Sequence, residues 1–267
     1  MHVIRRLRAE PHPVRFIASR LLWRSGLCRR LTIRFPERRY RLRFHPNAVS
    51  ASLWVDPDKG ADDRGVLARS LAPGRLAVDV GANVGALAVE AAALVGPQGT
   101  VYAFEPNPHV FPYLEDNVAL NDLKQVKCLN YAVGDTHEPV RFTADPRSDE
   151  FSRVDPEGAI SVPSTTLDDA IPGDARIALL KVDVEGYEMA VFRGATRTLE
   201  RTERIYFEVA DEHFERFGYT TAELLSLIRE SGFEIYRGGA AGTEPVPLTE
   251  HSGEWDNLIA ARPGISV

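Results

Sequence analysis

Ala77-Val-Asp-Val-Gly-Ala-Asn-Val-Gly85 is the stretch that decides the fold. Leu76 and the residues after it form an apolar run typical of a buried strand, and residues 86–95, apolar except for Glu90, indicate a helix. A strand that turns through glycines into a helix is where parallel α/β sheets usually hold a nucleotide-like ligand. The glycines allow the ligand to approach the turn backbone closely.

The residues of this turn narrow the choice of ligand. The turn has no Lys-Ser or Lys-Thr pair, so it is not a P-loop, and its glycines are not spaced as G-x-G-x-x-G. Asp79 at the strand end would repel a pyrophosphate, but it suits a ligand that carries an ammonium and a sulfonium group. The stretch therefore predicts S-adenosylmethionine as the cofactor, bound by Asp79, Gly81, Asn83 and Gly85.

A second acid supports this prediction. Residues 100–105 are typical of a short strand, rich in β-branched and aromatic residues, that ends in Glu105. In nucleotide-binding units of this kind, an acid at the end of the second strand accepts hydrogen bonds from ribose hydroxyls. We expect Glu105 to bind the cofactor in this way.

Motifs along roughly residues 40–263 resemble the FkbM-type methyltransferase family. The most specific of them is Leu180-Lys-Val-Asp-Val-Glu-Gly186, with Glu188 after it. The other matching segments are Asp79–Gly85, Phe104-Glu-Pro106, Asn117 and Asn121, Thr166-Leu-Asp168, Gly194-Ala195, Tyr206-Phe-Glu208 and Asp256-Asn-Leu-Ile-Ala-Ala-Arg-Pro263. The resemblance implies an S-adenosylmethionine-dependent O-methyltransferase that acts on a hydroxyl of a small molecule, a sugar, or a glycan or lipid-linked substrate.

The resemblance also implies an α/β fold, namely the Rossmann-like class I methyltransferase fold with a doubly wound, mostly parallel sheet of seven strands. Alternating strand-like and helix-like segments agree with a parallel sheet covered on both faces. The expected strands are 76–80, 100–105, 126–133, 177–184, 204–209, 233–236 and 258–261. The expected helices are 62–71, 86–95, 108–120, 188–199 and 220–231. Segments 140–143 and 159–162 are expected to form an antiparallel excursion.

Two further cofactor contacts follow from the class I resemblance. Asp135, after the third strand, resembles the residue that bonds the adenine amino group, and Val133 would lie against the adenine ring. An aspartate next to Gly134 is equally typical of a plain turn, so both interpretations stay open.

Three charged residues alternate along the expected fourth strand. Lys181, Asp183 and Glu185 would share one face of it, although buried charges are costly unless they are paired. One interpretation is structural, with Lys181 paired to Asp183 or Glu208; the other is that an acid accepts the proton of the hydroxyl that is methylated. We take Asp183, Glu185 and Glu208 as the catalytic candidates, with Asp183 first.

The metal requirement stays open at this stage. Asp183 and Glu208 could hold Mg²⁺ at adjacent strand ends, or Asp183 could act directly as the base. Among the histidines near element ends, His213 is the one to test as a base. The fourth strand is not followed by the Asp/Asn-Pro-Pro-aromatic run of amide and adenine nitrogen methylation, which favours an oxygen acceptor.

Two other functions remain as alternatives. The chain could be a nucleotide-cofactor oxidoreductase on a Rossmann-like fold, although it lacks the dinucleotide glycine spacing. It could also be a non-catalytic protein of this fold that binds anionic partners through its basic N-terminal arm. Few aromatic residues interleave that arm, so no nucleic acid is expected as a partner.

Charge is divided unevenly along the 267 residues. Residues 1–45 contain 13 arginines, no lysine and two glutamates, a net charge of +11, whereas the rest of the chain carries −17. We expect residues 1–45 to form a basic helix and hairpin, and residues 46–267 the methyltransferase domain. The amphipathic pattern of residues 14–28 is typical of a cap helix whose arginines meet the acidic body, or of a helix on an anionic membrane.

The remaining sequence features indicate the cellular compartment of the protein but not its oligomeric state. Two unpaired cysteines, 100 residues apart, suit a reducing cytosol, and neither a membrane span nor a signal peptide is expected. A cytoplasmic protein, with membrane contact through residues 1–30 as an open possibility, is the prediction. The oligomeric state is not predicted.

Overall fold

The computed structural model describes residues 11–35, 38–145, 148–238 and 245–267, and its centre is one mixed sheet. This sheet has eight strands in the order β14-β13-β15-β12-β11-β3-β4-β5. Only β14 and β15 run against the others, because β15 is antiparallel to β12 and β13, and β14 is antiparallel to β13. The strand bounds are β3 Leu76–Val80, β4 Thr100–Phe104, β5 Val126–Leu129, β11 Ile177–Val182, β12 Arg204–Val209, β13 Glu234–Arg237, β14 Val246–Pro247 and β15 Asp256–Ala261.

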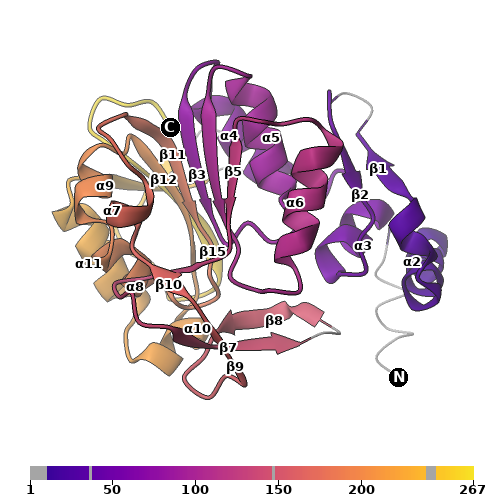
Figure 1. Ribbon diagram of the computed structural model, residues 1–267. Coiled ribbons are helices and arrows are strands. Elements are labelled where there is room, and N and C mark those ends of the chain that lie inside the picture. The colour runs from indigo at the N-terminus through magenta and orange to yellow at the C-terminus, as the bar shows by residue number, and fades with distance from the viewer. Residues whose placement is uncertain (1–10, 36–37, 146–147, 239–244) are drawn as a thin grey trace.

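Seven of these strands are the predicted ones, so the predicted class I α/β fold is confirmed; β14 is a two-residue addition at the edge. Helices cover both faces of the sheet (Figure 1). One face packs against α4 (Ala61–Ser70), α5 (Ala86–Val95) and α6 (Phe111–Leu120). The other face packs against α8 (Glu188–Arg193), α9 (Thr196–Glu200) and α11 (Thr221–Glu230).

Local sequence explains where these helices begin and end. Gly85, in the left-handed region, precedes α5, and the capping box of Thr220 and Glu223 starts α11. The predicted helix over residues 188–199 is divided into α8 and α9 at Gly194. A Cβ on Gly194 would lie 1.9 Å from the Gly134 carbonyl oxygen, so these two segments touch there through backbone alone.

The third predicted strand, over residues 126–133, is shorter than expected. It ends at Leu129, and Ala132–Val133 forms β6, which pairs with β10 (Ser164–Thr165). The cause is Asn130, whose side-chain amide donates to the carbonyl oxygens of Glu105 and Pro106 at 2.7 and 3.2 Å. The chain therefore leaves the sheet next to the acid at the end of β4.

The predicted antiparallel excursion is present and larger than expected. Strand β7 (Val140–Asp145) pairs with β9 (Ile160–Val162), and the unpredicted β8 (Ser148–Val154) adds a third strand. This small sheet lies below the main one in Figure 1. The short helices α7 (Leu167–Ala170) and α10 (Asp211–Phe214) and the 3-10 turn Glu215–Phe217 complete the second half of the chain.

The N-terminal segment packs on the outside of α5 and α6. It consists of α2 (Pro13–Ser25), a 3-10 turn (Leu27–Arg30), the hairpin strands β1 (Thr32–Arg34) and β2 (Arg41–Arg43), and α3 (Ala48–Val55). The hairpin was predicted, whereas α3, which Asn47 caps, was not. A cluster of buried side chains joins Cys28, Leu42 and Phe44 to Val89 of α5. Within the described residues, no helix is long and apolar enough to cross a membrane.

Candidate active site

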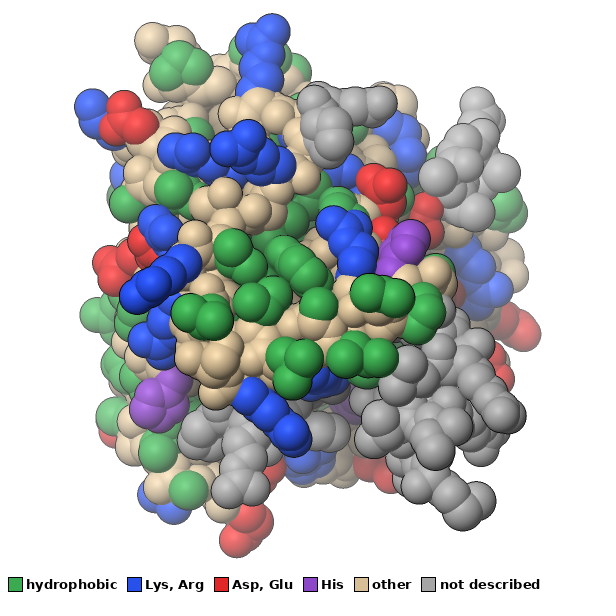
Figure 2. Space-filling view, turned by 90° about the vertical axis from the view of Figure 1, so that its right-hand side faces the viewer, with side chains coloured by type: hydrophobic (Ala, Val, Ile, Leu, Met, Phe, Trp, Pro, Cys, Tyr) green, Lys and Arg blue, Asp and Glu red, His purple; other side chains and the backbone are tan. Residues whose placement is uncertain are grey.

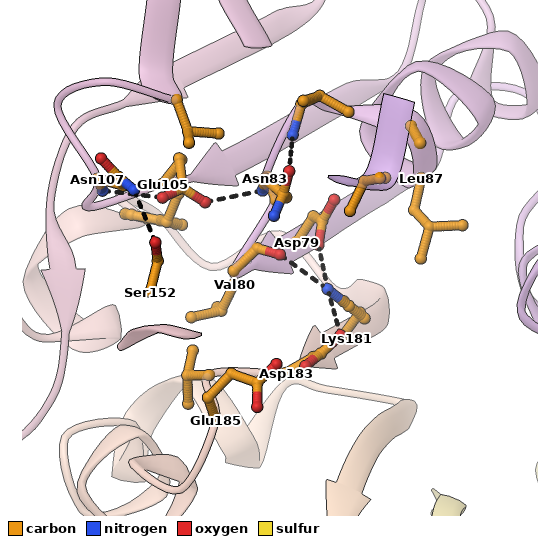
Figure 3. A pocket seen from close by; sticks show the side chains of 18 of the residues that line it. Asp79, Val80, Asn83, Leu87, Glu105, Asn107, Ser152, Lys181, Asp183 and Glu185 are labelled. Carbon is orange, nitrogen blue, oxygen red and sulfur yellow. Dashed lines mark hydrogen bonds and ion pairs between the residues drawn. The ribbon is translucent and has the colours of Figure 1, made fainter. Parts of the chain in front are cut away.

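A cavity of about 430 Å³ opens at the carboxyl ends of β3, β4 and β11. Figure 3 shows it with the turn after β3 on one side and the turn after β11 on the other. This is the edge of a doubly wound sheet at which ligands bind. The cavity is lined by residues that were predicted to bind the cofactor, namely Asp79, Gly81, Asn83, Glu105 and Val133. It is also lined by two of the predicted catalytic residues, Asp183 and Glu185.

The two glycines of the β3–α5 turn are required by neighbouring protein atoms. Gly81 has φ +81, and a Cβ there would lie 1.9 Å from the carbonyl oxygen of Asp183. Gly85 has φ +82, and a Cβ there would lie 2.6 Å from Cδ1 of Leu114. From the sequence, the glycines were explained by a close approach of the cofactor. At Gly81, the close approach is one between the β3 turn and the end of β11. Gly85 does not line the cavity and fits the turn against α6.

Lys181 connects the β3 turn to the end of β11. Its Nζ lies 3.2 Å from Asp79 Oδ1 and 3.3 Å from Asp183 Oδ2, and it donates to the Gly81 carbonyl at 2.9 Å. Burial disfavours the charged amine, but Asp183 and Asp79 outweigh it and raise the pKa of Lys181 above its ordinary value. The predicted Lys181–Asp183 pair is thus present, whereas the contact with Asp79 was not foreseen.

Glu105 closes the opposite end of the cavity. Its carboxylate accepts the backbone N–H of Asn83 on one oxygen and that of Asn107 on the other, each at 2.8 Å. Only 6% of the residue is exposed, and burial raises the pKa of Glu105 to about 7. Each oxygen keeps a further lone pair that a ligand hydroxyl could use.

A second group of polar side chains lies where β11 and β12 end. Oxygens of Glu185 and Glu208 lie 3.6 and 3.5 Å from Nδ1 of His213. One ligand atom from each of the three lies within 4.8 Å of the others, a spacing that could hold a cation. The set differs from the predicted pair of Asp183 and Glu208, because the turn after β11 brings Glu185 toward β12.

The titration of this group follows from its burial. Burial, and then the charge of Asp183, raise the pKa of Glu185 to about 7 and that of Glu208 to about 8. Burial also lowers the pKa of His213, whose Nδ1 has no hydrogen-bond partner among the described residues. Trp255 donates its indole N–H to the other oxygen of Glu208.

Glu188 holds the turn that presents these acids. It is fully buried, and its Oε1 accepts the N–H of Val184 at 3.0 Å and that of Gly186 at 3.4 Å. Between them, Glu185 has φ +56, which is uncommon for a residue with a Cβ. Burial raises the pKa of Glu188 to about 8. Glu188 is therefore a positioning residue behind Glu185.

A second cavity, of about 590 Å³, adjoins the first. Its wall includes Glu208 of β12, Asn257 of β15 and Trp255, which precedes β15. Asp183 and Lys181 line both cavities. The side chain of Asp183 is 43% exposed, so its carboxylate is accessible where the two spaces meet.

Asp135, like Gly85, is a cofactor candidate that does not line the cavity. It is exposed and is not part of the lining, although Val133, two residues before it, is buried and lines the wall. Gly134, between them, packs against Tyr187, whose ring lies 2.8 Å from where a Cβ on Gly134 would be. The turn interpretation of Asp135 agrees with this placement.

The sequence did not indicate the wall contributed by the N-terminal segment. Arg38 and Tyr40 line the first cavity, and both reach Glu90 of α5, Tyr40 by a short hydrogen bond and Arg38 at 3.9 Å. Asn47 donates its amide to Asn83 Oδ1 at 3.0 Å. The sequence contained one signal of this contact. Glu90 is the single acid in an otherwise apolar helix, and it could have suggested that polar side chains pack on α5.

The comparisons with known proteins agree with this geometry. The model of the methyltransferase FkbM domain matches residues 79–235, more than half of the chain. The chain belongs to the FkbM methyltransferase family. The predicted family and the predicted enzyme class, a methyltransferase, are thereby confirmed.

The individual similarities are low. The chain is 28% identical to hexuronic acid methyltransferase AglP of Haloferax volcanii over 134 residues, 49% of this chain and 54% of that protein, so it matches about half of that relative's length. It is 25% identical to 2-O-methyltransferase NoeI of Sinorhizobium fredii over 193 residues, 64% of this chain and 77% of that protein. A solved SAM-dependent methyltransferase from Aquifex aeolicus is 16% identical, with 77% of this chain and 93% of that one covered at a TM-score of 0.43.

Proposed function

We propose that this FkbM-family protein transfers the methyl group of S-adenosylmethionine to a hydroxyl of a small molecule or a sugar. The observation that carries the proposal is the placement of Asp183 where a donor-sized cavity and a second cavity meet. A transfer between two substrates needs two adjoining sites, and a carboxylate at their junction can accept the proton of the acceptor hydroxyl. The names of two relatives, a hexuronic acid methyltransferase and a 2-O-methyltransferase, support an oxygen on a sugar-like acceptor.

The first cavity fits the methyl donor. Its volume of about 430 Å³ lies within the range of about 300–1,000 Å³ usual for small-molecule sites. Glu105 has free lone pairs for ribose hydroxyls, and Val133 offers an apolar wall. The acid Asp79 suits the ammonium and sulfonium groups, while Lys59 and Arg64 line the same cavity and suit the donor carboxylate.

When bound, S-adenosylmethionine supplies a methyl group on a positive sulfonium, and departure of that group leaves a neutral thioether. The protein contributes the alignment of the acceptor oxygen with that carbon, worth up to about 7–11 kcal/mol in favourable cases. As the oxygen–carbon bond forms, the hydroxyl proton must leave, and Asp183 is placed to accept it. Lys181, at 3.3 Å, holds the Asp183 carboxylate in its orientation.

The second cavity suits an acceptor with several hydroxyls. Carboxylates accept hydrogen bonds from hydroxyls, and Glu208 and Asp256 line this space. Trp255, 60% exposed, offers a flat apolar face beside them. We assign the acceptor to this cavity on these grounds.

The substitution Asp183→Asn tests the proposal, because it keeps the shape of the side chain and removes the charge that accepts a proton. We expect normal folding and donor affinity, with a turnover reduced by at least about 100-fold. The measurement is transfer of a labelled methyl group to a panel of free sugars and glycans, with donor affinity from calorimetry. Asp174→Asn, at an exposed position, is the matched control. Wild-type turnover in Asp183→Asn would assign Asp183 a purely structural role.

The second group of polar side chains, at the ends of β11 and β12, has an alternative role, which is to bind a divalent cation such as Mg²⁺. Glu185, Glu208 and His213 have the spacing to hold one, and oxygen ligands with one imidazole are an acceptable set. Activity that is lost in EDTA and restored by added Mg²⁺ would place a cation in the reaction. Activity unchanged by EDTA would indicate that a carboxylate accepts the proton of the acceptor hydroxyl without a metal ion.

A further inference from the structure

The outward side of α2 carries an apolar stripe that no described residue covers. Val14 is 79% exposed, Ile17 47% and Leu21 63%. Residues at this spacing lie on one helix face. Leu27, just after the helix, is 48% exposed and extends the stripe. Figure 2 views this side of the molecule and shows apolar side chains gathered in the middle of it, with Lys and Arg side chains around them.

The stripe is not the core-facing side of α2, because that side is occupied. Ser19 is buried, and Leu22 and Trp23 pack against the cluster that contains Cys28 and Phe44. The helix therefore has a second apolar face, directed outward. Singly scattered apolar residues on a surface are ordinary, but a helix face of them bordered by charges indicates an interaction site.

The arginines of α2 do not meet the acidic body, contrary to our expectation for a cap helix. Arg15 donates to the Val55 carbonyl at 3.2 Å and lies over the Trp54 ring, and Arg20 lies over the rings of Phe16 and Trp23. In the described part of the chain, neither arginine has a carboxylate partner.

The charge that the chain around α2 contributes is positive. Residues 11–36 contain six arginines and neither aspartate nor glutamate. Arg24, in the last turn of α2, and Arg29 and Arg30, beyond it, are exposed. The surface thus combines uncompensated positive charge with apolar side chains.

We propose that this α2 surface, formed by Val14, Ile17, Leu21, Leu27 and the arginines beside them, binds the surface of an anionic lipid bilayer. The apolar stripe would enter the boundary between headgroups and acyl chains while the arginines bind lipid phosphates. A nucleic acid fits less well, because Arg20 already lies over the rings of Phe16 and Trp23, the two aromatic residues of α2 that could stack on bases. A symmetric contact with a second copy would place arginine against arginine.

Such binding would bring the first cavity close to the membrane. Helix α3 packs on α2 and also supplies Val49, Ser52 and Leu53 to the cavity wall. A bound α2 would therefore hold the enzyme where lipid-linked acceptors are found. The binding itself does not depend on the acceptor, so it can fail or succeed separately from the proposed function.

The test is flotation of the full-length protein with vesicles of phosphatidylcholine alone or with about one third phosphatidylglycerol. We expect flotation with the anionic vesicles only, weakened by 1 M salt, where the Debye length falls to about 3 Å. The double variant Ile17→Ser/Leu21→Ser should bind at least tenfold more weakly, and Arg24→Gln/Arg30→Gln likewise. Val246→Ser, also at an exposed apolar site, and Arg176→Gln/Arg193→Gln, at exposed arginines, are the matched controls and should bind as the wild type does.

Two results would overturn the proposal. One is no flotation with anionic vesicles at low salt; the other is equal flotation of the wild type and Ile17→Ser/Leu21→Ser. If, in addition, sedimentation shows a dimer that this double variant abolishes, the surface belongs to a second copy. Thermal melting of each variant, expected to match the wild type, separates loss of binding from loss of folding.

Discussion

At the scale of single residues, the buried acid Glu188 makes the stability of the protein depend on pH. An unfolded glutamate titrates near 4.5, whereas burial raises the pKa of Glu188 in the folded protein to about 8. Between these values the folded state keeps a proton that the unfolded state has released, so the free energy of unfolding falls as the pH rises. At 1.36 kcal/mol per pKa unit, the contribution lost between pH 4.5 and about 8 is up to about 5 kcal/mol.

Glu188→Gln should remove this part of the pH dependence. The glutamine oxygen can still accept the N–H groups of Val184 and Gly186, so the turn should persist. Urea unfolding at pH 5 and pH 8 would give the comparison, with a smaller difference in the variant than in the wild type. Glu105, Glu185 and Glu208, whose pKa values are also raised by burial, should leave a residual slope of the same sign. An unchanged slope in Glu188→Gln would mean that Glu188 is ionised in the folded protein.

At the scale of elements, the contact between the β3 turn and the end of β11 gives a sharp prediction. Gly81 and Gly74 both have φ +81, but a Cβ on Gly74 would meet nothing within 4 Å. Gly74→Ala should therefore cost only the left-handed backbone strain, about 1–2 kcal/mol. Gly81→Ala adds a clash with the Asp183 carbonyl and should cost clearly more and weaken donor binding. Equal costs by denaturant unfolding would show that the turn can move away from β11.

The elements differ in how well the sequence predicts them. Strands β3, β4, β11 and β12 were predictable because buried parallel strands are short continuous apolar runs, and Asp79, Glu105 and Asp183 stand at their ends. The partners of those acids were harder to predict, because they depend on register. Lys181 meets Asp79 because β3 pairs with β11. Helix α3 has little periodicity and depends on the Asn47 cap, so it was missed.

At the scale of the whole molecule, the division into an extension of residues 1–45 and a domain of residues 46–267 remains a proposal. The buried cluster that joins Cys28 and Leu42 to Val89 argues that the extension stabilises the domain. Deletion of residues 1–30 removes the buried Cys28 and the partly buried Leu22 and Trp23 from that cluster, and a fully buried apolar side chain, the upper limit for each, is worth roughly 1.5–3 kcal/mol.

We therefore expect the truncated protein to melt at least about 4 °C lower, since a domain of this size loses about 2–4 °C per kcal/mol. Ile17→Ser/Leu21→Ser, which changes only the outward face of α2, should melt as the wild type does. An unchanged melting temperature on deletion would make residues 1–30 an appendage. Donor affinity should change little, because Gly81, Asn83 and Glu105 lie outside the deleted segment.

The two adjoining cavities have a practical consequence for anyone who wishes to change what this enzyme methylates. Among the residues that the structure describes, only Gly60, Asp63, Leu87, Lys181 and Asp183 are common to both walls. Trp255 and Asn257 belong to the second wall alone, on a part of the sheet remote in sequence from the donor turn. Randomised libraries restricted to such positions can explore new acceptors while every clone keeps the same donor chemistry, which makes a single donor-consumption assay valid for screening all of them.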